Sequence, residues 1–350
     1  MTTMTSVRPR TLGIGDRIRL RYTPRAVLVC ALTALAAIVV LVLSLSTGDY
    51  PVSLGELFAS LVGQGDRATD FIVLDLRMPR LLVAMGVGLA LGASGAVFQS
   101  LTRNPLGSPD IIGFNWGASA AAVAAITFFG ASAFATSLAA ILGGALAAIV
   151  VYLLAFQRGV QGYRLILCGI GISAMLTSVV HYLLSRANLA EATQAQVWLT
   201  GTLNGRGWEQ ATPLWIALVV LLPILAVYGR RLNVLEMGDE AASALGVRVE
   251  TTRVILIVLG VFLTGMSTAA CGPIMFIALT APQIARRLTR STGAGITAGA
   301  IMGAFLLLLS DFVAQRVFGD TELPVGVLTA AVGGLYLAWL LAREWKAGRS

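Results

Sequence analysis

The sequence predicts an all-α, polytopic membrane protein with about ten transmembrane helices and both termini in the cytoplasm. Hydrophobic residues make up 57% of the 350 positions, and charged residues only 12%, about half the share usual in globular proteins. The mean hydropathy is +0.84. The charges lie between apolar runs of membrane-spanning length, as orientation signals do. The net charge of +8 therefore does not indicate a nucleic-acid partner.

Ten apolar segments carry this prediction. The first is long enough to span a bilayer core of ~30 Å and lacks an Ala-x-Ala cleavage site, so we interpret it as a retained helix. The fourth follows the third after a tight turn near residues 130–132, and Pro273 opens the eighth. The segments are residues 26–46, 81–101, two within 111–156, 165–185, 211–229, two short ones within 254–285, 294–310 and 323–342.

The segment of residues 47–79 lies between the first two spans and is rich in acidic residues. Its apolar side chains Leu54, Leu57, Phe58 and Leu61 recur at helical spacing. We therefore expect an extracytoplasmic loop that contains a short surface helix.

The basic residues set the predicted orientation. With both termini in the cytoplasm, 19 of the 25 basic residues lie on the cytoplasmic side, as the positive-inside rule requires. A single transmembrane domain then covers residues 26–343, between a basic tail of residues 1–25 and a short tail of residues 344–350. The basic residues on the opposite side are Arg67, Arg77, Arg80, Arg186, Arg206 and Arg316.

Residues 231–253 form a polar, predicted cytoplasmic loop between two apolar runs. Asp239 is a suitable N-cap and Gly246 a suitable C-terminal stop for a short helix. Between them Ala241, Ala242 and Leu245 fall on one face. Because so short a helix is not stable alone in water, we expect it to dock on a partner; a loop resting on the membrane surface is the alternative.

The sequence contains no phosphate-binding loop, no paired metal-ligand spacing and no nucleophile motif, so we expect neither an enzyme nor a resident cofactor. We interpret the three cysteines as packing residues and His181 as a buried, hydrogen-bonded side chain. No carboxylate falls well inside a predicted span, which argues against an ion-coupled secondary transporter. We therefore expect the energy for any transport to come from a partner chain.

Several ordered motifs resemble the FecCD-type permeases, the membrane subunits of ABC importers for ferric siderophores, haem and cobalamin. The resemblance extends from about residue 26 to residue 343. Within the family, the segments that begin at Phe98, Asn104, Leu235 and Gly333 are most similar to a ferric-enterobactin permease subunit. The motifs are Arg77-Met-Pro-Arg80, the segments 92–99, 103–113 and 236–246, Gly272-Pro-Ile, Ala281-Pro-Gln-Ile-Ala-Arg-Arg287, Asp311 and Glu322-Leu-Pro-Val-Gly326.

The resemblance implies ten spans in a bacterial cytoplasmic (inner) membrane, two permease subunits, two cytoplasmic ATPases and an extracytoplasmic substrate-binding protein. It implies import of a ferric siderophore, with ATP and Mg bound by the ATPases and no cofactor in this chain. A haem or cobalamin importer is the alternative within the class, and an ion-coupled secondary transporter the alternative outside it.

The resemblance also implies site residues. The coupling helix would contact the ATPase through Gly238, Asp239, Ala241, Ala242, Leu245 and Gly246. Arg77, Arg80 and Arg316 would dock the binding protein through charge-assisted pairs with glutamates. The cytoplasmic gate would comprise Asn104, Leu106, Gly162 and Tyr163, and the outer gate Asn188. No catalytic or metal-binding residue is implied.

Three positions depart from the common pattern of the family. Gln315 stands where many relatives have a docking arginine, with Arg316 next to it, and Gln283 follows Pro282 in place of histidine. Gly333 and Gly334 begin a segment without the usual Gly-x-Pro. The first and third departures also resemble the enterobactin subunit, whose partner permease is a distinct chain, so we expect a heterodimer.

Overall fold

The computed structural model describes the chain except residues 1–9, 15–17, 158–161, 292, 318–322 and 348–350. The described residues are almost entirely helical. A small antiparallel hairpin precedes the first helix and was not predicted. It consists of β1 (Arg10–Ile14) and β2 (Ile18–Tyr22). The helices are α1 (Pro24–Ser46), α2 (Leu54–Leu61), α3 (Arg67–Asp70), the π-helix η1 (Phe71–Arg77), α4 (Met78–Thr102), α5 (Phe114–Phe129), α6 (Ala133–Ala155), α7 (Gly162–Arg186), α8 (Leu189–Leu199), α9 (Trp208–Leu235), α10 (Asp239–Ala244), α11 (Val249–Cys271), α12 (Ile277–Thr289), α13 (Ile296–Arg316) and α14 (Val325–Ala347).

The all-helical fold class is confirmed, and each of the ten predicted spans coincides with a helix. Seven helices of the described chain are long and apolar enough to cross a membrane. α5 and the apolar part of α14 are shorter, and α12 has only 13 residues with Arg286 and Arg287 in its last turn. The count of ten spans therefore stays a prediction.

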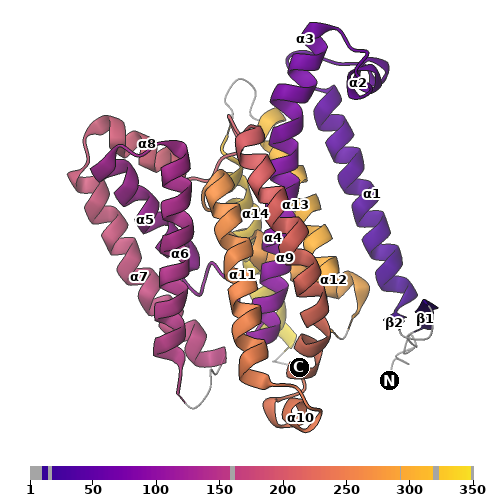
Figure 1. Ribbon diagram of the computed structural model, residues 1–350, viewed down its shortest axis with the longest axis vertical. Coiled ribbons are helices and arrows are strands. Elements are labelled where there is room, and N and C mark those ends of the chain that lie inside the picture. Colours follow the sequence, from indigo (N-terminus) through magenta and orange to yellow (C-terminus); the bar gives the residue numbers. More distant parts are fainter. Residues whose placement is uncertain (1–9, 15–17, 158–161, 292, 318–322, 348–350) are drawn as a thin grey trace.

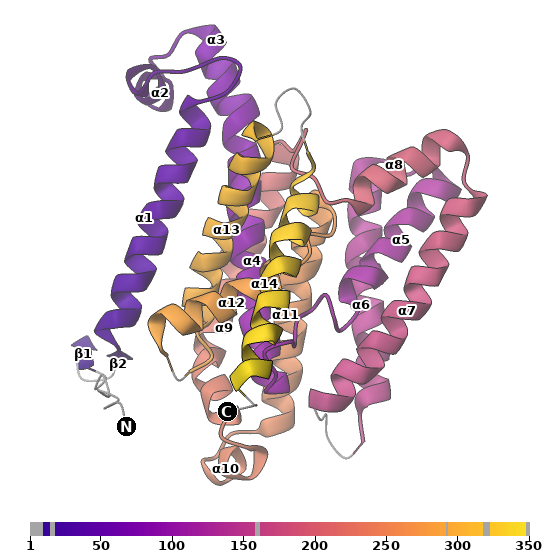
Figure 2. The same ribbon diagram turned by 180° about the vertical axis from the view of Figure 1, so that it is seen from behind.

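The helices surround α4, which lies at the centre of the molecule (Figures 1 and 2). α9, α11, α12 and α13 pack against it, α5 to α8 form a bundle on one side, and α1 packs chiefly on α13 at the other side. α2, α3 and α8 lie at one end of the molecule. α10, the hairpin and the end of α14 lie at the opposite end, so the described chain starts and finishes where α10 lies.

Small residues allow the central helices to approach closely. A Cβ atom at Gly92 would lie 2.1 Å from the carbonyl oxygen of Gly299, and one at Gly88 would lie 2.4 Å from that of Gly303. Both partners belong to α13. Backbone contact of this kind is the usual means by which helices associate tightly within a membrane, where water supplies no hydrophobic drive.

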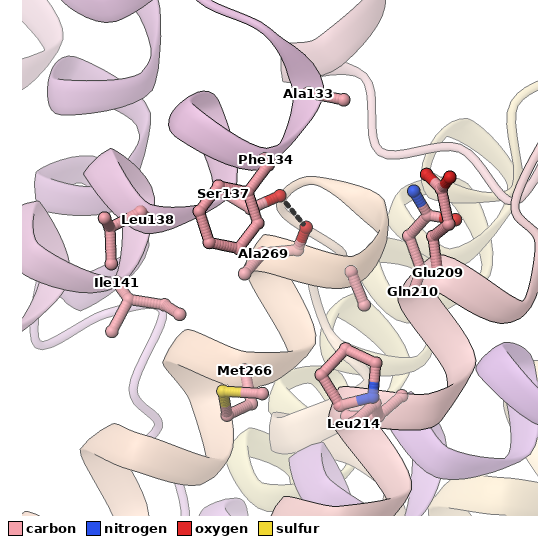
Figure 3. Close-up of a pocket in the computed structure, with 12 residues that line it drawn as sticks. Ala133, Phe134, Ser137, Leu138, Ile141, Glu209, Gln210, Leu214, Met266 and Ala269 are labelled. Carbon is pink, nitrogen blue, oxygen red and sulfur yellow. Dashed lines mark hydrogen bonds between the residues drawn. The ribbon is translucent and has the colours of Figure 1, made fainter.

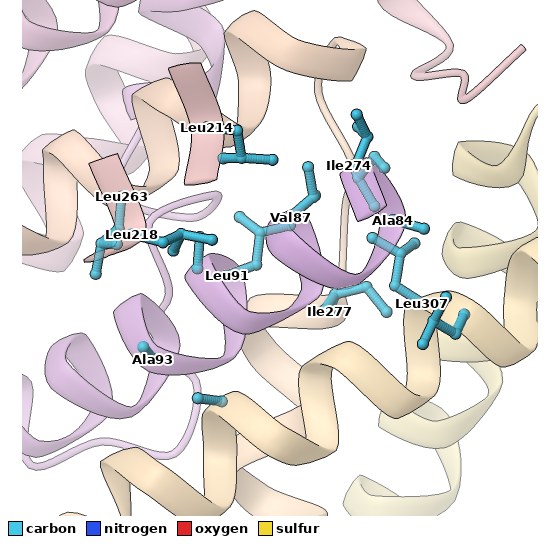
Figure 4. Packing of buried hydrophobic residues seen from close by; sticks show 14 of the residues in the cluster. Ala84, Val87, Leu91, Ala93, Leu214, Leu218, Leu263, Ile274, Ile277 and Leu307 are labelled. Carbon is cyan, nitrogen blue, oxygen red and sulfur yellow. The ribbon is translucent and has the colours of Figure 1, made fainter. Parts of the chain in front are cut away.

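Apolar side chains fill the space around α4. In Figure 4, Val87 and Leu91 of α4 lie among Leu214 and Leu218 of α9 and Leu307 of α13. One buried polar contact interrupts this packing, where the Ser94 hydroxyl lies 2.9 Å from that of Thr264 and from the carbonyl of Gly260. The Ser94 and Thr264 hydroxyls thus find their partners inside the helix bundle, as a nonaqueous interior requires.

Two surface helices cover the end of the molecule opposite α10. The predicted surface helix is confirmed as α2, where Ser53 and Glu56 form a capping box. Hydrogen bonds from the backbone and hydroxyl of Ser53 hold the pKa of the exposed Glu56 carboxyl below its ordinary value. α8 lies in a segment expected to be a polar connection, and Asn188 and Glu191 cap it in the same way.

The predicted starts of two spans are wrong. α12 begins at Ile277 rather than at Pro273, because Phe276 adopts a left-handed conformation (φ 69°) that no helix continues through. α4 continues upstream through η1 and α3 to Arg67, where a loop was expected. Before α12 the Phe276 N–H donates to Asp110, 166 residues away in the chain.

We predict that Gly92→Ala destabilises the protein by about 1–3 kcal/mol, because the added methyl group must push α4 and α13 apart. Thermal denaturation of the detergent-purified protein measures this. Gly171→Ala is the matched control, since a Cβ atom there meets no atom within 4 Å. Equal stability of the two variants would contradict the close contact.

Candidate functional site

α10 projects from the lower end of the molecule in Figure 1, between α9 and α11. Its C-terminal stop is confirmed. Gly246 (φ 80°) donates its N–H to Ser243 and Val247 donates to Ala242, which is the Schellman arrangement. The predicted N-cap is wrong, because Gly238 (φ 118°) caps the helix and Asp239 is its first residue. The change of position frees the Asp239 side chain for other contacts.

The Asp239 carboxylate joins three parts of the chain. Arg103, at the end of α4, lies 2.9 Å from one oxygen, and Arg253, in the first turns of α11, lies 2.8 Å from the other. Arg103 also donates to the carbonyl of Leu235 at 2.8 Å, and Arg253 pairs with Glu250. Arg253 is only 6% exposed, so the two carboxylates compensate a charge that has little contact with water. We call Arg103, Asp239 and Arg253 the carboxylate clamp.

A second polar cluster fixes the end of α9 on the other side of α10. Arg286 of α12 lies 3.0 Å from Glu236 and donates to Ser100 of α4 at 2.6 Å. Asn233 accepts the backbone N–H of Ala294 at 2.7 Å. Side-chain contacts therefore join α10 to α4 and α11, and they join the segment between α9 and α10 to α12.

The surface of α10 differs from the predicted docking face. Ala242 is fully buried, so it packs α10 against the rest of the chain and is not accessible to a partner. Leu245 is 64% exposed and Met237 is 69% exposed. Gly238 and Gly246 leave open space beside the helix, because a Cβ atom at either would meet no atom within 4 Å. The open apolar surface therefore comprises Met237, Leu245 and the two glycines.

The predicted cytoplasmic gate residues come from two segments that lie together. A Cβ atom at Gly162, at the start of α7, would lie 2.6 Å from the Cα atom of Thr102 at the end of α4. Asn104 follows two residues later and accepts the N–H of Leu106 at 2.9 Å. Tyr163 is 71% exposed on this chain. Asn188, the predicted outer-gate residue, lies at the opposite end, where it caps α8.

The connection from α4 to α5 carries a carboxylate that sequence reasoning missed. Asp110 accepts hydrogen bonds from the Asn115 amide at 2.6 Å and from the Phe276 N–H at 3.3 Å, and Asn115 in turn accepts from Thr268 at 3.1 Å. Asp110 also lines a pocket of about 400 Å³ with Leu337 of α14. The sequence feature that could have indicated Asp110 is its position directly before a run without charges.

Asp311 lies inside α13, because this helix extends to Arg316 and not only to the predicted end of the span at residue 310. Its carboxylate is fully buried, pairs with Arg80 at 2.9 Å and accepts from Gln315 at 2.6 Å. The expectation that no carboxylate lies within a span is therefore wrong, and the argument that it gave against an ion-coupled carrier no longer holds. Gln315, which stands where a docking arginine was expected from the family pattern, donates a hydrogen bond to Asp311.

The other two predicted docking arginines hold the connection between α1 and α2. Arg77 donates to the carbonyls of Leu45 and Tyr50, each at 2.6 Å. Arg316 donates to the carbonyl of Thr47 at 2.9 Å. Each residue is partly exposed at the end of the molecule opposite α10. All three arginines therefore have structural contacts within the chain.

His181 is exposed on α7, so the expectation that it is a buried side chain is wrong.

A pocket of about 160 Å³ lies between α6, α9 and α11 (Figure 3). There the Ser137 hydroxyl donates to the carbonyl of Ala269 at 2.8 Å, and Glu209 and Gln210 lie on the opposite wall. The contact joins the α5 to α8 bundle to the central helices.

This geometry defines a multi-pass membrane protein with a short helix held at one end on four helix ends. The chain belongs to the FecCD transport family, whose model matches residues 35–343.

Its relatives match along nearly their full length. The ferric enterobactin transport system permease protein FepG of Escherichia coli (strain K12) is 43% identical over 92% of this chain and 98% of its own. The achromobactin transport system permease protein CbrC of Dickeya dadantii (strain 3937) is 38% identical over 90% of this chain and 91% of its own. A solved structure described as an inward-facing conformation of a metal-chelate type ABC transporter aligns with a TM-score of 0.79 and 28% identity, over 91% of this chain and 99% of that one.

We predict that Asp239→Ala lowers the free energy of unfolding by about 1–3 kcal/mol, because Arg253 loses one of its two carboxylate partners in a buried position. Thermal denaturation of the purified protein measures the loss. Glu240→Ala is the matched control, since it removes the neighbouring exposed carboxylate of α10. If both variants lose the same stability, the carboxylate clamp does not hold α10.

Proposed function

We propose that this chain is the permease subunit of an ATP-binding-cassette importer that moves a ferric siderophore into the cytoplasm. The observation that carries the proposal is the identity of relatives that match along almost the whole chain and are named for siderophore transport. The substrate of this chain is then an iron chelate with a bacterial siderophore as its organic part.

The proposed assembly contains a sister permease, two cytoplasmic ATPases and an extracytoplasmic substrate-binding protein. The permease itself hydrolyses nothing, and ATP and Mg²⁺ are bound by the ATPases. The exposed α10 surface supports this arrangement, because Met237 and Leu245 are apolar side chains directed away from the chain that holds them. An apolar patch of this kind in a polar loop is typical of a docking site.

The proposed mechanism is alternating access driven through α10. ATP binding closes the ATPase dimer and displaces α10, which moves as a rigid body because its ends are fixed by the carboxylate clamp and the Schellman turn. Arg103 then transmits the displacement to the end of α4. Asn104 and Leu106 lie in the segment directly after it, and Thr102 at the end of α4 lies against Gly162 at the start of α7. Coupling helix and cytoplasmic gate are thereby joined through one side chain.

We predict that Leu245→Arg abolishes co-purification with the ATPases and abolishes uptake, since a charge replaces the apolar side chain in the proposed contact. Gln157→Arg is the control, an exposed change in the connection from α6 to α7 on the same predicted side. Uptake is measured in cells that lack the gene and carry either variant. Normal co-purification and transport by Leu245→Arg would contradict the role of α10.

The same cells identify the substrate. Uptake of an iron-labelled ferric siderophore should depend on this chain, whereas uptake of haem or cobalamin should not. Transport should persist after collapse of the ion gradients and stop when ATP is depleted. Transport that follows the ion gradient instead would favour the secondary carrier.

We further propose that Arg77 and Arg316 contribute to docking of the binding protein, in addition to their contacts with the connection from α1 to α2. Substitution by glutamine keeps a hydrogen-bond donor and removes the charge. Arg77→Gln with Arg316→Gln should weaken binding by about tenfold, which corresponds to ~1.4 kcal/mol. The affinity of the assembled transporter for its binding protein measures this.

Arg80 is left intact in that experiment, because its substitution would leave the buried Asp311 carboxylate without its ion pair. Arg186→Gln is the control, since Arg186 lies at the end of α7 on the same predicted side. An equal loss of affinity in the control, or none in the double variant, would exclude the two arginines from docking.

A further inference from the structure

A pocket of about 630 Å³ opens between α1, α9 and α13 near the end of the molecule where α10 lies. Ala26, Leu222, Ala226 and Ile301 give it an apolar interior. Its volume lies within the range of ~300–1,000 Å³ that small-molecule sites usually have. Neither the carboxylate clamp nor the proposed gate residues line it.

Arginine and hydroxyl residues line one end of this pocket or lie next to its lining residues. Arg230 lines it together with Thr289 and Ser291. Arg25 donates to the carbonyl of Leu288 at 2.7 Å, which places its guanidinium group beside Thr289. Arg290 lies between these two hydroxyl residues in the sequence, is exposed and has a left-handed conformation (φ 51°). We call Arg25, Arg230 and Arg290 the arginine rim.

The arginine rim differs from three arginines nearby that form ion pairs with carboxylates of the chain. Arg103, Arg253 and Arg286 are paired with Asp239, Glu250 or Glu236. Within the described part of the chain, no carboxylate forms an ion pair with a member of the rim. The rim therefore carries a positive charge that an anion outside this chain can neutralise.

The surroundings of the pocket indicate a ligand from the bilayer. Val27 and Leu28 of α1 and Val219 and Val227 of α9 are large apolar side chains exposed on the helices that border it. A surface of this composition lies against acyl chains in a membrane protein. A ligand that enters here needs an apolar part for the interior and an anionic part for the rim.

We propose that this pocket binds an anionic phospholipid, with the phosphate at the arginine rim and part of an acyl chain between α1, α9 and α13. Basic pockets between transmembrane helices are a recurrent form of headgroup site. Guanidinium groups suit phosphate because their donors match its oxygens in pairs. The bound lipid would fill the space between α1 and the central helices and hold α1 in place.

Native mass spectrometry of the assembled transporter, purified in a neutral detergent and incubated with phosphatidylglycerol, tests the proposal. We expect retention of phosphatidylglycerol and little retention of phosphatidylcholine. Arg230→Gln with Arg290→Gln should weaken phosphatidylglycerol binding by about fivefold for each arginine. Arg231→Gln with Arg248→Gln is the matched control, because Arg231 lies over the Tyr228 ring and neither residue lines the pocket.

The apolar part of the site is tested separately, with all charges kept. Ala226→Phe fills the interior and should abolish retention, whereas Val227→Phe on the exposed face of α9 should not. Millimolar inorganic phosphate should not displace the lipid. Equal binding of phosphatidylcholine, an equal effect of the control arginines, displacement by phosphate, or unchanged retention by Ala226→Phe would each overturn the proposal. These outcomes are independent of which chelate is transported.

Discussion

The structure depends on direct contact between the backbones of α4 and α13. Gly88 and Gly92 face Gly299 and Gly303 with no side chain between them, so the two helices are held by dispersion contacts and by their shape. α4 can therefore lie at the centre while α9, α11 and α12 pack on its other faces. The elements proposed to act in transport, α10 and the segment after α4, are attached to the ends of these same helices.

Polar groups also occur inside this apolar bundle at two places where the chain departs from a regular helix. Asp110 accepts the N–H of Phe276, which the break before α12 would otherwise leave without a partner, and Gln283 donates to the carbonyl of Pro105 at 2.6 Å. The segment after α4 therefore supplies an acceptor to the break before α12, and α12 in turn supplies a donor to that segment. Irregular backbone is tolerated at membrane depth only under this condition.

The sequence was sufficient for features determined by neighbouring residues. α2, the turn between α5 and α6, and the Schellman stop at Gly246 follow from local spacing and from glycine. It was insufficient where partners distant in the chain decide the outcome. Asp239 appeared suited to capping because its partners Arg103 and Arg253 are 136 and 14 residues away. Ala242 and Leu245 share a predicted face, yet only the tertiary packing reveals that the first is buried. The exposure of His181 likewise depends on which face of α7 meets its neighbours.

The connections of α1 have a consequence for how its sequence can vary. Arg25 joins its start to Leu288, and Arg77 and Arg316 join its end to the central helices through main-chain carbonyls. Between these ends, Leu32, Leu35, Ile38 and Val39 are more than 45% exposed. Selection on the middle of α1 therefore acts on hydrophobicity and length more than on identity, so exchange among apolar residues there should accumulate while the residues at its two ends stay constrained.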